Sequence, residues 1–183
     1  MATQFIDKKS TTAEVLNRPN AAGIATVEGG LVVNDGSAPA NVDQGTIVSV
    51  AVDTSLTKAL HAGRTVKTGA AALDLHLPNA TGSGDRYRIV IGTAANDNKI
   101  DCAAGADFFV GTILIGDGGD STAALVDSYT ADGTTHDFIN PTTAGGGGKV
   151  GDWLEFEDIA AGIWKVFGSF QNATDPTTPF ATS

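Results

Sequence analysis

The sequence predicts an all-β fold: an antiparallel β-sandwich or barrel of the jelly-roll type, preceded by an extended N-terminal arm. Three observations predict it. Runs rich in valine and threonine are short and are separated by glycine, asparagine and aspartate, which is typical of strands joined by tight turns. Ala71–Leu77 alternates between apolar and polar residues, as a half-buried strand does. No strand–helix–strand alternation is visible, so we expect no parallel α/β sheet.

The strands are placed by these runs and by the turn residues between them. In Ala71–Leu77 the alternate leucines share one face, Asp74 and His76 share the other, and Pro78 ends the strand because it has no N–H to donate. In Tyr87–Gly92 the tyrosine and the two isoleucines share a face. The expected strands are, in chain order, Thr46–Val52, Ala71–Leu77, Tyr87–Gly92, Lys99–Cys102, Phe108–Ile115, Ala123–Ser128, His136–Ile139, Trp153–Glu157 and Ile163–Phe170.

Three segments are expected: an arm over residues 1–45, a β-rich domain over 46–172 and a polar C-terminal tail over 173–183, in which Phe180 can dock on the domain. Apolar residues in the arm are sparse and lack a lasting period, so they can hardly offset the entropy lost on ordering. A disordered tail therefore stays open, as does an arm that orders on a neighbouring subunit and has a short helical turn near Thr12–Leu16. In the second case the contact residues are the apolar clusters Phe5, Ile6, Val15, Leu16, Leu31, Val32 and Val33.

The net charge is −10, and the excess of acid lies in the second half of the chain. Residues 1–99 hold nine acidic and nine basic residues, whereas residues 100–183 hold twelve acidic residues and only Lys149 and Lys165 as bases. Binding to nucleic acid needs lysine and arginine to neutralise phosphates, so we expect no nucleic-acid partner. The excess acid is either a solvated surface or one of two faces, the other being a neutral face that contacts a partner.

Cysteine content and hydropathy bear on the expected compartment. Cys102 is the only cysteine, so no intramolecular disulfide can form. No apolar run approaches the roughly 18 residues of a membrane helix, and no apolar stretch follows the charges at the N-terminus. We therefore expect neither a membrane span nor a secretory signal, and synthesis in a reducing cytoplasm.

Two glycine-rich segments suggest ligand sites that their spacing does not support. Asp117 and Asp120 in a glycine-rich loop resemble a calcium loop but lack the spacing of an EF-hand, so a hairpin turn is the favoured interpretation. Gly145–Gly148 followed by Lys149 suggests a phosphate loop, but the spacing differs from that motif and a strand follows in place of a helix. A flexible connection is expected there.

Histidine and cysteine show no catalytic or metal-binding pattern. No two of His61, His76 and His136 lie at metal-ligand spacing, and Cys102 has no nearby partner, so exposed or turn histidines are expected. No G-x-S-x-G elbow is present for nucleophilic catalysis. We expect no catalytic residue, no metal site and no cofactor.

Acidic residues crowd one strand, Asp152 to Asp158. Glu155 and Glu157 share a face with Trp153 and lie about 7 Å apart along a strand, a separation seen in glycoside hydrolases. Any exposed acidic strand meets that criterion, so a solvated acidic face is favoured over a sugar-contacting surface or a catalytic pair. Trp164 is expected to pack in the core beside Val166, or at a subunit seam.

Two separated motifs give the sequence a family resemblance. Leu77–Thr93 reads LPNATGSGDRYRIVIGT, and Gly151–Val166 reads GDWLEFEDIAAGIWKV, followed by TPFAT at Thr178–Thr182. In this order they resemble tailed-phage virion proteins with the patterns LPxATGSGxxYxxxxGT and GDxxxxxDxxxGxW. The resemblance covers roughly residues 70–182 and is with head decoration proteins and head-fibre components.

The motifs also make sense as structure. We expect Gly82 and Gly84 to adopt positive φ in a tight turn, and Arg86 and Arg88 to pair with the acidic strand. The strands Trp153–Glu157 and Ile163–Phe170 are expected to form a hairpin whose loop, Asp158–Gly162, places its glycine in the left-handed region.

The resemblance implies a structural protein of the phage particle, made in the bacterial cytoplasm, that binds and stabilises the capsid exterior as a decoration or cement protein. The implied partners are the major capsid protein and further copies of the chain, expected as a homotrimer, with neither nucleic acid nor membrane. The arm would be the attachment element. The alternatives are a head-fibre or adhesin module that binds host glycans through Trp153, Glu155 and Glu157, and a glycan-degrading enzyme.

Overall fold

The structure, a computed structural model, describes residues 24–27, 30–33, 40–42, 47–95, 97–102, 106–118, 126–142, 146–172 and 176–182, the first three ranges as backbone only. The chain divides into two compact units, Met1–Gln44 and Gly45–Ser183. In the first unit, β1 (Ile24–Val27), β2 (Gly30–Val33) and β3 (Ala40–Val42) form an antiparallel sheet in that order. The sequence did not predict these strands. The expected helical turn near Thr12–Leu16 lies outside the described residues.

The second unit is mostly β and contains one short helix, α2 (Lys58–His61). Its strands are β4 (Ile47–Val50), β5 (Thr54–Ser55), β6 (Thr65–Thr68), β7 (Asp74–His76), β8 (Arg86–Val90), β9 (Lys99–Asp101), β10 (Phe108–Asp117), β11 (Val126–Asp132), β12 (Phe138–Ile139), β13 (Trp153–Ala160), β14 (Ile163–Asn172) and β15 (Phe180–Ala181).

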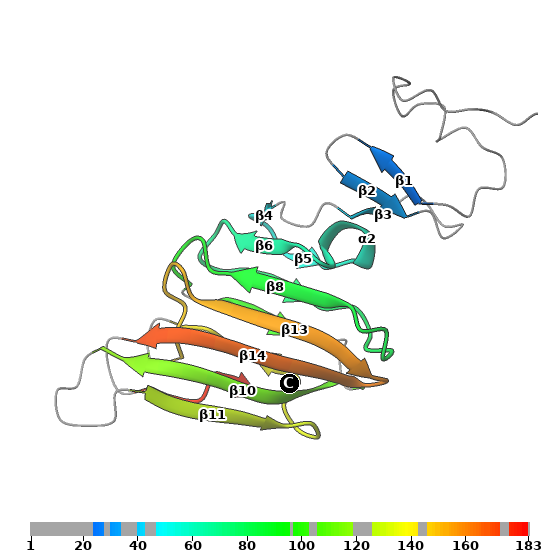
Figure 1. Cartoon of the computed structure of the whole chain (residues 1–183). Coiled ribbons are helices and arrows are strands. Elements are labelled where there is room, and N and C mark those ends of the chain that lie inside the picture. Colours follow the sequence, from blue (N-terminus) through cyan, green and yellow to red (C-terminus); the bar gives the residue numbers. More distant parts are fainter. Residues whose placement is uncertain are drawn as a thin grey trace, which may run out of the picture. The chain divides into compact units, whose positions relative to one another are not determined.

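These strands form two sheets. One, here called the large sheet, has the order β11-β10-β14-β13-β8-β6-β4, and Figure 1 shows its strands side by side. The other, the small sheet, has the order β15-β12-β9-β7-β5. The C-terminal segment returns to the small sheet, where Phe180 pairs with Ile139 and is buried, as expected from its size.

The sheets are mixed, so the prediction of a purely antiparallel, jelly-roll-like arrangement is wrong. Parallel pairs join β4 to β6, β6 to β8, β5 to β7, β7 to β9 and β10 to β14. From β4 to β9 the chain alternates between the sheets, so each crossover between parallel strands passes through the other sheet. Parallel strands need a crossover of a dozen or more residues, usually a helix. Residues 51–64 and 69–85 provide that length with little helix, which is why the lack of strand–helix–strand alternation misled the prediction.

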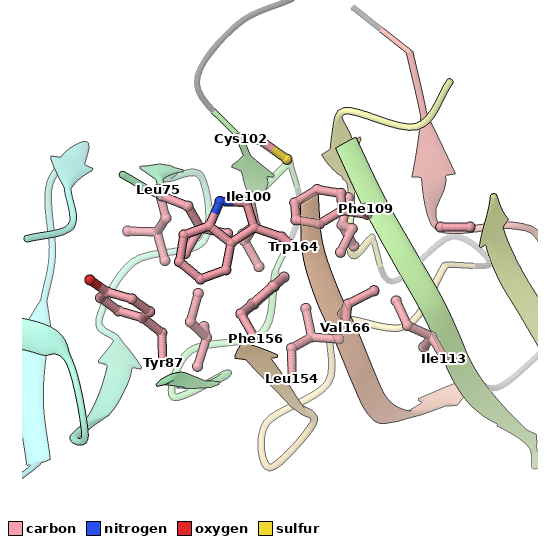
Figure 2. Close-up of a cluster of buried hydrophobic side chains, with 14 of the residues drawn as sticks. Leu75, Tyr87, Ile100, Cys102, Phe109, Ile113, Leu154, Phe156, Trp164 and Val166 are labelled. Carbon is pink, nitrogen blue, oxygen red and sulfur yellow. The ribbon is translucent and has the colours of Figure 1, made fainter. Parts of the chain in front are cut away.

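One hydrophobic core fills the space between the sheets. Its largest fully buried side chains are Trp164, Tyr87, Phe109, Phe156 and Phe170, and Figure 2 shows several of them beside Leu75 and Ile100 of the small sheet. The edge of the Tyr87 ring meets Trp164 at 5.6 Å between centroids, an arrangement favoured for aromatic pairs. The described side chains of this core all belong to the second unit.

The alternation that predicted individual strands is confirmed. The alternate leucines at 73, 75 and 77 are buried at 2%, 1% and 3% exposure, and Asp74 and His76 are half-buried. Tyr87, Ile89 and Ile91 are buried together in the same way. Trp164 and Val166 are both in the core, as predicted.

The predicted hairpin of the last long strands is also confirmed, although its loop is shorter. β13 pairs antiparallel with β14, and the strands continue to Ala160 and Ile163 with a register shift between Asp158 and Ala160. Only Ala161 and Gly162 lie between them, and Gly162 has φ +77°, the left-handed conformation that glycine adopts without strain.

A close backbone approach fixes the parallel pair of β10 and β14. Gly111 has φ +135°, and a methyl group on its Cα would lie 2.0 Å from the Val166 carbonyl oxygen. Gly116, on the same strand, would place a methyl group no nearer than 3.8 Å to the carbonyl oxygen of Phe170. Glycine is therefore required at position 111 and tolerant of replacement at position 116.

We expect Gly111→Ala to lower the free energy of unfolding by about 3 kcal/mol, because the added methyl forces the two strands apart and the φ angle is strained. Gly116→Ala is the matched control and should change it by less than about 0.5 kcal/mol. Urea denaturation of the full chain measures both. Equal stability of the two variants would contradict this packing.

Candidate functional site

The predicted arm contacts are not settled by the structure. Phe5, Ile6, Val15 and Leu16 lie outside the described residues, and Leu31, Val32 and Val33 lie on β2, where only the backbone is described. They stay predictions. The site is therefore built from the second unit, whose side chains are described.

The two motifs that carry the family resemblance lie against each other. The Gly162 N–H donates to the Ala80 carbonyl at 3.0 Å, and Thr81 forms a bridge with Ala161. The Trp164 Nε1–H donates to the carbonyl of Pro78 at 3.2 Å. The motifs are far apart in the sequence, but they form a single structural unit at the end of the β13–β14 hairpin.

Asp158 is the centre of that unit. Its side chain is buried, with 2% exposure, under the exposed turn Thr81–Ser83. The carboxylate accepts hydrogen bonds from the backbone N–H groups of Thr81, Gly82 and Ser83 at 2.6–3.1 Å, and from the hydroxyls of Thr81 and Ser83 at 3.0 and 2.9 Å. Gly82 has φ +78° and Gly84 has φ +75°, which confirms the predicted glycine turn. These donors are the ones a carboxylate needs to stay ionised when buried.

Those hydrogen bonds set the ionisation of Asp158. Burial alone would raise the pKa of this carboxyl, but the N–H groups of Thr81, Ser83 and Gly82 and the Ser83 hydroxyl outweigh it and lower the pKa to about 2. Asp158 is therefore ionised at neutral pH and saturated with donors from its own chain. It serves the fold and has no free lone pair to offer a substrate.

A second buried carboxylate, Asp152, explains the glycine-rich loop. Asp152 accepts the Lys149 N–H at 2.9 Å and the Gln171 N–H at 3.0 Å. Burial raises its pKa, although these donors and the Gly148 N–H oppose the shift. The N–H groups that a phosphate loop would offer to an anion are therefore taken up here by an aspartate of the same chain.

The expected flexible connection at 145–148 is wrong for its described part. Residues 146–148 are buried, and a methyl group on Gly147 would lie 2.5 Å from the Phe170 ring. Glycine is used here because an aromatic side chain of the core packs directly against the backbone.

The acidic strand is neutralised by neighbouring bases, as predicted. β13 pairs with β8 so that Glu157 faces Arg86 and Glu155 faces Arg88. Arg86 Nη2 lies 2.7 Å from Glu157 Oε1, whereas Arg88 Nη1 lies 4.0 Å from Glu155 Oε1. The hydrogen bond from Arg86 lowers the pKa of Glu157. Glu157 is thus held ionised, which is the opposite of what a catalytic acid requires.

An aromatic cluster lies on the outward face of the same strands. The rings of Trp153 and Phe167 form a T-shaped pair with 5.8 Å between their centroids, and the Arg88 guanidinium lies 5.2 Å from the centroid of the Trp153 ring. Phe167 is 46% exposed and Trp153 is half-buried. The sequence analysis did not find this cluster, because it expected the hairpin without a register, and the observed register places Phe167 opposite Glu155, next to Trp153 on the same strand face.

The outward face of the large sheet differs in charge from the rest of the chain. Its strands carry four outward bases, Lys67, Arg86, Arg88 and Lys165, against three outward acids, Asp132, Glu155 and Glu157. The whole chain has a net charge of −10. Both sheets combine strands from the first and second halves of the sequence, so the acidic half does not form a separate face.

The histidines were only partly anticipated. His61 is buried at 5% exposure in α2, and the Thr57 N–H donates to its Nδ1 at 2.9 Å, so the expectation of an exposed or turn residue is wrong there. Burial lowers its pKa.

His76 lies on the outward face of the small sheet. Its Nδ1 atom lies 2.6 Å from Asp101 Oδ1, and Ser55 is its pairing partner on β5. Ser55, His76 and Asp101 lie on three adjacent strands and have the residue types of a nucleophilic triad. Among the described side chains, however, Ser55 donates no hydrogen bond to His76, so the nucleophile–base contact of a triad is absent.

The remaining candidates do not assemble a site within the described residues. No group of three or more histidine, cysteine or acidic side chains that could hold a metal ion is found there. Asp117 is buried on β10, and Asp120 lies outside the described part. Cys102 is a buried free thiol whose pKa is raised by that burial. No helix of the described chain is long and apolar enough to span a membrane.

Comparison of the chain with models of known protein families, with curated proteins and with solved structures found no match. The candidate site is therefore defined by geometry alone: the outward face of the large sheet, centred on Trp153 and Phe167.

We expect Asp158→Asn to lower the free energy of unfolding at pH 7 by about 3 kcal/mol, because an amide offers one acceptor oxygen where two now serve five donors. The stabilisation by Asp158 has a definite pH dependence. Its folded pKa of about 2 lies below the ordinary 3.8, so the stabilisation is complete above about pH 5 and is lost as the pH falls towards 2. The difference in stability between wild type and variant should shrink over that range in chemical denaturation. A difference that stays constant from pH 7 to pH 2 would contradict the ionised network.

Proposed function

We propose that this chain is a structural protein of a tailed-phage particle, with a sandwich-like β body, that binds and stabilises the outside of the capsid. The observation that carries the proposal is that the two motifs resembling those of virion proteins meet around Asp158, where every hydrogen bond described for that carboxylate is internal. Both motifs therefore stabilise the fold and supply no reactive group, which is consistent with a structural role.

The acidic strand supports a mechanical role over hydrolysis. A glycosidase needs one carboxyl with a raised pKa as acid and a second carboxylate as base or nucleophile. Here Arg86 lowers the pKa of Glu157, and Arg88 neutralises the neighbouring Glu155 across the strand. Glu157, whose pKa is lowered, does not suit the role of that acid.

The glycan-binding alternative rests on Trp153 beside two glutamates. A sugar ring would stack on an open indole face, but the Arg88 guanidinium lies 5.2 Å over the Trp153 ring and Phe167 packs against that ring in a T-shaped arrangement. The geometry therefore favours a protein contact over a sugar platform.

Stabilisation would follow from linkage. A protein that binds only the assembled shell favours that state by mass action, by about 2.7 kcal/mol per site at a concentration one hundred times its dissociation constant. The N-terminal segment, residues 1–45, is the proposed attachment element. A closed cyclic trimer suits three-fold positions of a shell.

The test uses phage heads that lack the protein. We expect the full chain to co-sediment with the heads at saturating stoichiometry and to raise the temperature at which they release DNA. A chain of residues 45–183 should keep its cooperative melt, because Gly45–Ser183 is a compact unit that contains the described hydrophobic core, but should not bind. Full binding by the shortened chain would overturn the attachment role of the arm, and no binding by the full chain would overturn the proposed function.

A further inference from the structure

The short helix α2 depends on a buried histidine. The helix is a single turn, Lys58–His61, and His61 is its buried residue. The backbone N–H of Thr57 donates to the His61 Nδ1 atom at 2.9 Å, and the Thr57 side chain itself does not cap the helix. A side chain that reaches back to the residue before a helix satisfies a donor there, as in a capping box. The imidazole of His61 does this for α2.

This hydrogen bond fixes the protonation of the ring. A backbone N–H can only donate, so Nδ1 carries no proton and the proton of neutral His61 is on Nε2. A second proton, on Nδ1, would replace the acceptor with a donor that faces the Thr57 N–H. The Thr57 hydroxyl lies 3.5 Å from the same nitrogen, too far for a strong hydrogen bond. The contact with the Thr57 N–H therefore requires a neutral His61.

The surroundings of the ring also disfavour a positive charge. His61 is 5% exposed, and this burial is the main cause that lowers its pKa from the ordinary 6.5. The backbone of Thr57 opposes the shift in part, but its carbonyl already accepts the His61 backbone N–H at 2.9 Å. The charged side chain that acts on the ring is Arg64, a cation, which lowers the pKa further.

The nearest described carboxylate of the segment is engaged elsewhere. Asp85, just before β8, lies 3.1 Å from the Nζ atom of Lys58, a side chain that is 71% exposed. Within the described chain no carboxylate acts on the His61 ring. A proton added to His61 would therefore be a buried and uncompensated charge, which destabilises the state that buries it.

The segment that contains α2 is weakly held. It lies in the crossover from β5 in the small sheet to β6 in the large sheet. Leu60 is 59% exposed, so α2 adds little apolar contact to the body. Beyond the helix, the Gly63 N–H donates to the Arg86 carbonyl at 2.7 Å. Segments with few buried apolar contacts open at a lower free energy than the whole domain.

We propose that the segment Thr57–Arg64 is an acid-sensitive switch, in which a proton on His61 releases the segment from the body while both sheets stay folded. The closed state is fully stable above the ordinary pKa of 6.5, because the ring is then neutral whether the segment is closed or open. It loses stability as the pH falls from 6.5 towards the lower pKa of the closed state. The switch concerns this crossover alone and is independent of the proposed capsid role.

The test measures amide hydrogen exchange of the full chain at about pH 7.5 and about pH 5, on either side of the ordinary histidine pKa. After correction for the intrinsic exchange rate, exchange across residues 57–64 should accelerate by about tenfold in acid, because one proton changes an equilibrium by up to tenfold per pH unit. The strands β10 and β14 should keep their protection. Acceleration that is equal in these strands would show unfolding of the whole unit and would overturn the switch, as would no acceleration at all.

Two variants identify the residue responsible. His61→Asn places an acceptor oxygen near the position of Nδ1 and cannot titrate, so its exchange over 57–64 should not respond to pH. His76→Asn, on the outward face of the small sheet, is the matched control and should respond as the wild type does. A wild-type response in His61→Asn would overturn the assignment. A thermal melt by circular dichroism at neutral pH verifies that both variants fold.

If His61→Asn does not fold, nitrogen-15 shifts of the wild-type imidazole decide the question. The account predicts a proton on Nε2 and none on Nδ1 at neutral pH, with Nδ1 gaining a proton over the same pH range in which exchange accelerates. A proton on Nδ1 at neutral pH, or a ring that stays neutral while the segment opens, would overturn the switch.

Discussion

The second unit depends on one buried carboxylate. The turn that accommodates Asp158 is the crossing from β7 in the small sheet to β8 in the large sheet, so its hydrogen bonds fix where the chain passes between sheets. Another buried carboxylate, Asp107, accepts the Ala80 N–H at 2.7 Å and lies just before β10, at the next crossing between the sheets. Strands as short as β7 and β8, with three and five residues, form few backbone hydrogen bonds to their neighbours, so these bonds alone fix their register weakly. Buried charges that accept several backbone donors supply the missing specificity.

This use of acid changes what the composition means. The twenty-one acidic residues suggest metal ligands or catalytic acids. Asp152 and Asp158, however, accept hydrogen bonds from backbone N–H groups in turns of their own chain. Glu155 and Glu157 face arginines across a strand pair. On the outward face of the large sheet, Trp153 and Phe167 lie among four basic and three acidic side chains. Asp152 and Asp158 therefore stabilise turns of the fold, whereas the outward face has a mixed character.

Much of the second unit could be predicted because its signals are local. The leucines of β7 and the isoleucines of β8 alternate with polar residues, and Gly162 marks the hairpin between β13 and β14. The parallel pairs could not be predicted, because they join strands separated by a visit to the other sheet and no local pattern reports such a partner. The buried state of Gly147 and the donors around Asp158 depend on the same long-range packing. The contact between Trp153 and Phe167 could not be predicted either, because it depends on the hairpin register, which includes a shift between Asp158 and Ala160.

The central claim, that this chain works by covering the outside of a phage shell, is tested most directly by an electron-microscopy reconstruction of heads saturated with the full-length protein. The account predicts added density on the outer surface of the heads that fits the two-sheet body. Heads without added density would contradict it.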